Sequence, residues 1–219
     1  MPGREPRRLL ILGGTGEGAA LARATSSGAA LAGRLEVVTS LAGRTRAPAA
    51  VPGEVRVGGF GGADGLADYL VRQRIDLVVA ATHPFAATIS ANARDACARA
   101  GVGRLILARP PWRRRPDDRW IEVDDAAQAA AELADHVVVS GRGPFTVAGE
   151  RRLLTAHRID VVVSKASGGD ATYAKIAAAR EMELPVIMVR RPPAPQGERV
   201  TSVAAALAWI ANRLGGIGG

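Results

Sequence analysis

Residues 9–18 decide the fold of this chain. They are Leu9-Leu10-Ile11-Leu12-Gly13-Gly14-Thr15-Gly16-Glu17-Gly18, and an alanine-rich stretch follows at 19–24. Four consecutive aliphatic residues predict a buried parallel strand, and the alanines predict a helix, so the glycines fall at the junction. Such a junction exposes backbone N–H groups at a positive helix end, which suits a nucleotide phosphate. Because the spacing departs from the usual dinucleotide fingerprint, a simple tight turn is the alternative.

The composition indicates an α/β protein. Apolar residues make up 47% of the 219 residues and aromatic residues only 4%, so the core is built from Ala, Val, Leu and Ile. No apolar run reaches membrane-spanning length, and we expect no membrane partner. The single cysteine, Cys97, excludes an internal disulfide and a cysteine-based metal cluster. We therefore expect no metal site and a reducing, cytoplasmic location.

The net charge of +8 is carried almost wholly by arginine, since Lys165 and Lys175 are the only lysines. We expect no nucleic-acid partner, because neither a basic helix face nor a set of stacking aromatic residues is evident. The cluster 113–115 is read as a solvated loop. The scattered arginines suit a polyanionic small molecule instead, because guanidinium groups can bind carboxylates through two parallel hydrogen bonds.

Apolar runs and helical patterns alternate along the chain, which predicts a doubly wound parallel sheet. A proline-rich, charged stretch at 109–118 separates two halves, so we expect domains at 1–110 and 111–219. In the first half, strands are expected at 9–12, 35–40, 55–57, 76–81 and 102–108, and helices at 19–24, 65–72 and 84–100. In the second half, strands are expected at 137–140, 159–164 and 185–189, and helices at 124–134, 148–156, 171–181 and 202–214.

The second strand ends without an acidic residue. Dinucleotide-binding folds usually place Asp or Glu there to hold the adenosine ribose. This chain instead has Ser40, followed by Arg44 and Arg46. A hydroxyl and two cations suit a ribose 2′-phosphate, so the sequence favours NADPH over NADH; an ordinary polar loop is the alternative.

Two further motifs follow strands of the first half. Gly58-Gly59-Phe60-Gly61-Gly62 is either a loop that covers a flat ligand or a flexible turn. Thr82 and His83 follow the fourth strand, and the carboxyl ends of parallel strands are where ligands bind in open α/β sheets. His83 could donate a proton or a hydrogen bond there; a purely structural histidine is the alternative.

In the second half, Ser140-Gly141-Arg142-Gly143-Pro144-Phe145 and Ser164-Lys165-Ala166-Ser167-Gly168-Gly169 each end a strand with small residues and a cation. Both suit an anionic ligand. We find no Ser-His-Asp order, phosphate-loop lysine or catalytic carboxylate pair. A reaction driven by a bound redox cofactor needs none of these groups.

Taken together, the motifs resemble the precorrin-6A reductase family of cobalamin biosynthesis. The resemblance is carried, in the family's order, by residues 11–18, 40–45, 58–62, 81–86, 108–112, 142–145 and 164–169. It implies two Rossmann-like parallel-sheet domains with a substrate cleft between them. It also implies reduction of a ring C=C bond of precorrin-6A by NADPH, with a polycarboxylate tetrapyrrole as substrate.

The resemblance further implies roles for individual residues. Cofactor-binding positions would be Gly13, Gly14, Thr15, Gly16, Glu17, Ser40, Arg44, Gly59, Phe60 and Gly61. Thr82 and His83 would be catalytic and face the reacting ring. Substrate carboxylates would be received by Arg142, Lys165, Ser167 and Gly168.

Three departures from the family pattern stand out. Ala80 and Ala166 replace the usual Asp and Asn, and residues 134–136 run almost directly into the motif at 142–145, so the second domain is expected to be abridged. We expect a monomer. The alternatives are a non-catalytic tetrapyrrole- or nucleotide-binding protein of the same fold and a Rossmann-type reductase or epimerase acting on another substrate. Against the last, Tyr173 and Lys175 are two residues apart and not at the spacing of the usual Tyr-x-x-x-Lys pair.

Overall fold

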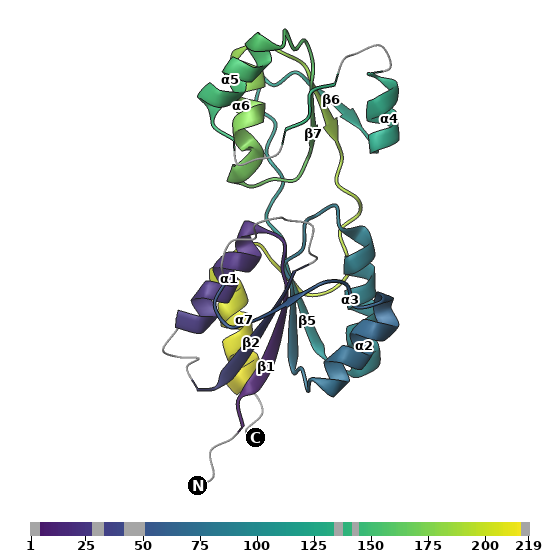
Figure 1. Cartoon of the computed structure of the whole chain (residues 1–219), viewed down its shortest axis with the longest axis vertical. Coiled ribbons are helices and arrows are strands. Elements are labelled where there is room, and N and C mark those ends of the chain that lie inside the picture. Colours follow the sequence, from purple (N-terminus) through teal and green to yellow (C-terminus); the bar gives the residue numbers. More distant parts are fainter. Residues whose placement is uncertain (1–4, 28–32, 42–50, 134–137, 142–144, 216–219) are drawn as a thin grey trace. The chain divides into compact units, whose positions relative to one another are not determined.

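A computed structural model describes residues 5–27, 33–41, 51–133, 138–141 and 145–215 (Figure 1). The chain divides into two compact units, Met1–Arg109 with Ala194–Gly219 and Pro110–Pro193. The chain first passes from one unit to the other between residues 109 and 110, next to the expected domain boundary between 110 and 111. The C-terminal segment, however, belongs to the first unit and not to the second, where the sequence analysis placed it.

The first unit is built on a parallel sheet of six strands in the order β3-β2-β1-β4-β5-β9. The central strand β1 pairs with β2 and with β4, so that Leu12 lies opposite Ser40 on one side and Ala80 on the other. The strands are β1 (Arg7–Leu12), β2 (Leu35–Leu41), β3 (Glu54–Val57), β4 (Leu77–Ala80), β5 (Gly103–Leu107) and β9 (Arg199–Val200).

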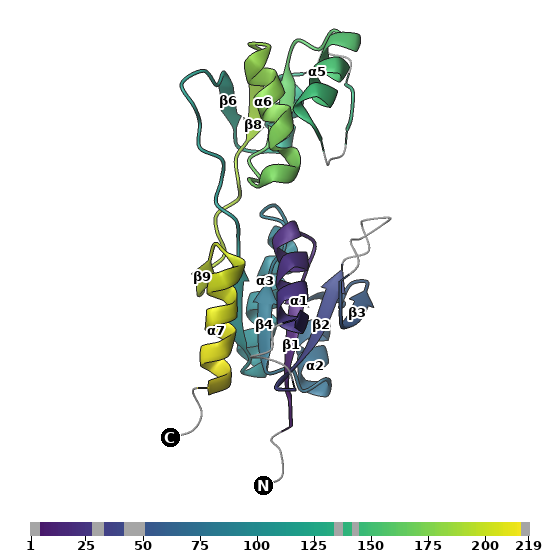
Figure 2. The same ribbon diagram turned by 90° about the vertical axis from the view of Figure 1, so that its left-hand side faces the viewer.

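Helices cover both faces of this sheet, α1 (Gly16–Ser27) and α7 (Val203–Gly215) on one and α2 (Gly62–Arg72) and α3 (Ala87–Ala100) on the other (Figures 1 and 2). Side chains of β1 alternate between the two cores. Leu9 and Ile11 pack in the α1–α7 core, whereas Leu10 and Leu12 pack in the α2–α3 core. This double burial explains the unbroken aliphatic run at the start of the chain.

The strand order changes direction at β1. From β1 the chain proceeds outward to β2 and β3, and then returns through α2 to β4 on the other side of β1. The carboxyl ends of β1 and β4 therefore form a topological switch point, the place where open α/β sheets bind their ligands.

The second unit has a parallel sheet of three strands in the order β6-β8-β7, formed by β6 (Trp120–Val123), β8 (Val186–Val189) and β7 (Val162–Lys165). Helix α4 (Ala126–Ala131) packs against β6 and β8, and α5 (Val147–Ala156) packs against α6 (Tyr173–Glu181) (Figure 1). A short 3₁₀ turn at Asp170–Thr172 leads into α6.

Three expectations for the second half need correction. Residues 138–140, expected in a strand, form neither strand nor helix. The linker continues directly into β6, which the sequence analysis missed. Residues 199–200 form β9, which pairs with β5 in the first unit and brings α7 onto that sheet.

Candidate active site

The switch point of the first unit gathers the predicted cofactor motifs at one sheet edge. The N–H of Gly13 donates to the carbonyl oxygen of Ser40 at 2.9 Å, and the N–H of Gly58 donates to that of Leu41 at 2.9 Å. On the other side of β1, the N–H of Ala81 donates to the carbonyl oxygen of Leu12 at 2.9 Å. These bonds extend the ladders beyond the strands. They hold the glycine-rich turn between residues 40 and 81, with residue 58 one strand further along the same edge.

Thr15 shapes the turn between β1 and α1. Its hydroxyl donates to the carbonyl oxygen of Ala81 at 2.9 Å and accepts the N–H of Gly18 at 3.2 Å. The second bond caps the first turn of α1, and the first ties that turn to the residue after β4. Thr15 therefore orients the N-terminus of the helix that the sequence assigned to phosphate binding.

The glycines of this turn occupy their positions for different reasons: backbone conformation, close packing, or neither. Gly14 has φ of 120°, a conformation that favours glycine. A Cβ on Gly18 would lie 3.1 Å from the Cβ of Ala81, so this glycine allows α1 to approach β4 closely. Gly16 has neither constraint: its φ is ordinary and a Cβ would have no neighbour within 4 Å. A close-approaching ligand would account for glycine at this position.

The end of β2 carries Ser40, which is buried with 6% of its surface exposed. The neighbouring Thr39 hydroxyl is also buried and has no hydrogen-bond partner among the residues that the structure describes. Arg44 lies outside those residues, so its part in 2′-phosphate binding stays a prediction from the sequence.

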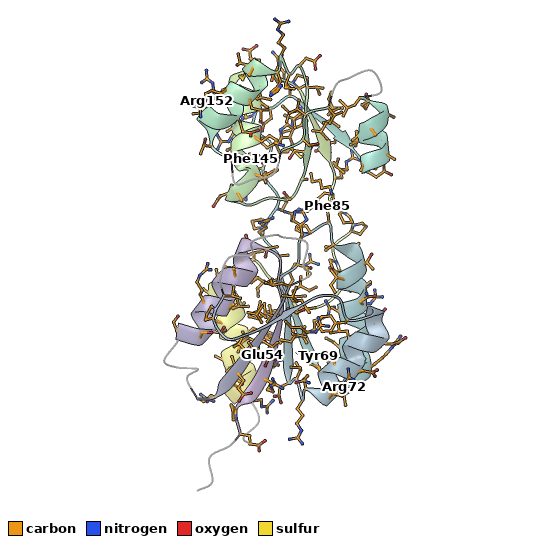
Figure 3. All side chains as sticks on the ribbon, in the orientation of Figure 1. Glu54, Tyr69, Arg72, Phe85, Phe145 and Arg152 are labelled. Carbon is orange, nitrogen blue, oxygen red and sulfur yellow. The ribbon has the colours of Figure 1, made fainter. Side chains whose placement is uncertain are left out.

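The loop Gly58–Gly62 is fastened by Arg56. Its guanidinium donates to the carbonyl oxygens of Gly58 and Gly59 at 2.6 and 2.7 Å and lies 3.9 Å from the centre of the Phe60 ring. Phe60 in turn packs edge-on against Tyr69, whose pKa is raised by burial and by Glu54 (Figure 3). The ring of Phe60 thus packs against the α2–α3 core. The backbone at Gly59 and Gly61 has open space beside it.

Thr82 and His83 follow β4, as expected. The Nδ1 atom of His83 accepts the N–H of Phe85 at 3.2 Å, so in the neutral ring the proton is on Nε2. The Thr82 and Ser90 hydroxyl oxygens are 3.4 Å apart. A neutral histidine with its proton on Nε2 can donate a hydrogen bond from that atom, whereas transfer of a proton requires the imidazolium form.

Arg109 is a residue of this edge that the sequence analysis did not select. Its Nη1 lies 3.4 Å from Oε2 of Glu17, and both side chains are mostly buried, with 16% and 24% exposed. The pair connects the segment after β5 to the first turn of α1. The rule that led to His83, position just beyond the carboxyl end of a strand, would also have found Arg109.

In the second unit, the loop after β7 is held by Arg191. The Nε of Arg191 donates to the carbonyl oxygen of Ala166 at 2.5 Å, and its Nη2 donates to those of Ser167 and Pro110 at 2.8 and 3.1 Å. Gly168 has φ of 66°, and a Cβ there would lie 2.2 Å from the oxygen of Pro110. Trp112 donates from Nε1 to the Gly169 oxygen at 2.9 Å.

Of the predicted substrate residues, Lys165 ends β7, Ser167 is buried and Gly168 lies beside Pro110 in the same loop. Arg142 lies outside the described residues. The neighbouring Phe145 is described, and its ring lies 4.9 Å from the ammonium group of Lys175 (Figure 3). The described residues contain no group of three or more potential metal ligands, and none of their helices is long and apolar enough to cross a membrane.

Comparison with known proteins decides the family. The model of the precorrin-6x reductase family, CbiJ/CobK, matches residues 8–139 and 126–211. The chain belongs to this family. A solved structure described as CobK precorrin-6A reductase, 38% identical, superimposes with a TM-score of 0.85 and covers 94% of this chain and 97% of its own.

Curated relatives of the precorrin-6x reductase family agree along nearly the whole chain. The precorrin-6A reductase of Rhodococcus erythropolis is 42% identical over 244 positions, which cover 93% of this chain and 97% of the relative. That of Sinorhizobium sp is 41% identical over 251 positions, covering 96% and 95%. Both alignments are longer than the 219 residues of this chain, so the relatives contain residues without a counterpart here. This agrees with an abridged chain.

Proposed function

We propose that this protein is an NADPH-dependent oxidoreductase acting on CH–CH groups, which reduces one C=C bond of precorrin-6A to give precorrin-6B in cobalamin biosynthesis. The observation that carries the proposal is the identity of about two residues in five, along nearly the whole chain, with proteins named precorrin-6A reductase. In the reaction a hydride adds to one ring carbon and a proton to its neighbour, so the substrate gains two electrons and two hydrogens.

Several features at the edge of the first sheet support NADPH as the cofactor. The open space at Gly16, the positive φ of Gly14 and the capped first turn of α1 together form a backbone cradle for a pyrophosphate. Ser40 and Arg44 would hold the 2′-phosphate, and the backbone at Gly59 and Gly61 would border the cofactor. When bound, NADPH supplies the hydride; the protein supplies orientation and electrostatics.

The substrate carries carboxylates, and the proposed contacts are cationic or small. Lys165, Ser167 and Gly168 lie in the loop held by Arg191, and Arg142 belongs to the preceding motif. Electrostatic clamping of the carboxylates would hold the macrocycle in one orientation, which lowers the entropic part of the barrier. His83 would donate the proton from Nε2 of its imidazolium form and be left as the neutral ring, and Thr82 would orient the reacting edge.

We further propose that the protein works in the cytoplasm as a monomer. One cysteine, buried and unpaired, suits a reducing compartment. The net charge of +8 then serves the polycarboxylate substrate and not a nucleic acid or a membrane.

The decisive test is stopped-flow oxidation of NADPH, followed at the nicotinamide absorbance, with precorrin-6A added with and without cobalt. We expect NADPH to be oxidised with one of the two forms of precorrin-6A, with or without cobalt. His83→Gln should oxidise NADPH more slowly and bind it with unchanged affinity. Binding of NADPH and of the macrocycle with no oxidation of NADPH, whichever form of the substrate is added, would favour the alternative, a non-catalytic tetrapyrrole-binding protein.

A further inference from the structure

Glu17 and Arg109 form an ion pair at the N-terminus of α1, where the proposed function places a negatively charged ligand. Glu17 is the second residue of α1, in the turn where the proposed function places a pyrophosphate. A carboxylate there carries the same sign of charge as the ligand. The helix N-terminus favours either anion, so carboxylate and pyrophosphate compete for one positive region.

Arg109 supplies a positive charge that pairs with the Glu17 carboxylate. Its Nη1 lies 3.4 Å from Oε2 of Glu17, and both side chains are largely withdrawn from water, so the pair interacts in a medium of lower dielectric than the surface. A guanidinium at this distance offsets part of the field of the carboxylate, and the contact holds the Glu17 side chain toward the segment after β5. The N–H groups of the turn then face a ligand with less competing negative charge.

We propose that Arg109 is a positioning residue for the cofactor, acting through Glu17 by neutralising and orienting its carboxylate beside the pyrophosphate. This inference rests on the proposed NADPH site. It assigns a specific role to each partner: Glu17 fixes Arg109 at the edge of the sheet, and Arg109 makes the acidic residue compatible with a doubly charged pyrophosphate.

The test is a double-mutant cycle with Arg109→Gln, Glu17→Gln and the combined variant, and with Arg109→Lys as the charge-conserving control. Affinity is measured by calorimetry for two ligands, NADPH and adenosine 2′-monophosphate. The second ligand contains the adenosine 2′-phosphate but no pyrophosphate. Thermal unfolding of each variant monitors folding.

Arg109→Gln is expected to weaken NADPH about tenfold, because the charge of Glu17 is then unbalanced, and to leave adenosine 2′-monophosphate unchanged. The combined variant should recover NADPH affinity to within about twofold of wild type, since both charges are gone. Arg109→Lys should stay close to wild type. A merely structural role would instead weaken both ligands together.

Three results would overturn the inference. If the combined variant binds NADPH as weakly as Arg109→Gln, Arg109 contacts the cofactor directly. If both ligands weaken in parallel, the pair serves the fold. If all variants bind NADPH equally, the pair has no role in binding. Absence of NADPH binding in the wild-type protein would overturn the proposed function, and this inference with it.

Discussion

The hydroxyl of Thr15 joins two elements at the switch point: it donates to the carbonyl oxygen of Ala81 at 2.9 Å and at the same time caps α1 through Gly18. Ala81 directly follows β4, the neighbour of β1 in the sheet. One side chain therefore links the glycine-rich turn to the strand that leads to His83. The geometry of the cofactor turn and of the proposed proton donor depend on the same residue.

Replacing Thr15 by Val removes both hydrogen bonds at nearly constant volume. We expect the free energy of unfolding to fall by about 1–2 kcal/mol, because the helix cap is lost and the buried carbonyl oxygen of Ala81 is left without its donor. Thr15→Ser, which keeps the hydroxyl, should lose much less. Urea unfolding of the three proteins checks this. A loss in Thr15→Ser with none in Thr15→Val would mean that the methyl group, and not the hydroxyl, holds the turn.

Gly16 and Gly18 offer a matched pair of substitutions two residues apart. In Gly16→Ala the new methyl group meets open space in a helical residue, so stability should be retained or slightly raised, while NADPH binding should weaken at least about tenfold. In Gly18→Ala the methyl group meets the Ala81 Cβ at 3.1 Å, so stability should fall by about 1–3 kcal/mol. Calorimetric unfolding and NADPH fluorescence titration measure both quantities. Unaltered NADPH affinity in Gly16→Ala would contradict the placement of the pyrophosphate.

The sequence was sufficient to predict the part of the first unit that precedes residue 110, because local patterns there agree with tertiary placement. The run Leu9–Leu12 is buried on both faces, and each predicted strand from 35 to 108 has a counterpart in the sheet. The second half was less predictable. An apolar helical stripe at 203–215 shows that α7 needs a partner, but not which sheet provides it.

Two short strands, β6 and β9, were not predicted because their sequences carry no clear strand pattern. The two residues of β9 carry no periodicity, and β6 follows an arginine-rich stretch that resembles a loop. Residues 138–140 are apolar enough for a strand, yet strand formation needs a pairing edge as well as apolar side chains. In the site, Arg191 was missed because its partners are backbone carbonyls, which no short motif encodes. Arg109 was not selected although it lies just beyond the carboxyl end of β5.

Arg44→Ala tests cofactor choice. A ribose 2′-phosphate held by a guanidinium gains charge-assisted hydrogen bonds that NADH cannot form. We expect NADPH affinity to fall at least about tenfold and NADH affinity to change less than about twofold. Parallel titrations with the two cofactors measure the ratio. Equal weakening of both would exclude Arg44 from 2′-phosphate binding.

Cys97 makes stability sensitive to alkaline pH. Burial raises the pKa of its thiol from 9.0 to about 11. Between these values the unfolded chain releases the proton while the folded chain keeps it, so stability falls as pH rises, by at most about 3 kcal/mol. Cys97→Ala should show a shallower decline than wild type from pH 9 to 11 in urea unfolding. Identical slopes would mean that the thiol is not protected in the folded state.

Arg191 and Arg190 are adjacent arginines with different partners. Replacing each in turn therefore distinguishes an effect of loop geometry on substrate binding from an effect of net charge. Arg190 is exposed and pairs with Glu122 and Asp124, whereas Arg191 binds backbone oxygens of the loop after β7. Arg191→Gln should raise KM for the macrocycle about tenfold without changing NADPH affinity, because the loop that presents Lys165 and Ser167 loses its anchoring bonds.

Arg190→Gln alters the net charge by the same amount and should leave KM within about twofold of wild type. Steady-state kinetics at saturating NADPH give both values. A similar rise of KM in both variants would show that the total positive charge attracts the substrate and that the loop held by Arg191 has no particular role. A rise confined to Arg191→Gln would place substrate recognition on this loop.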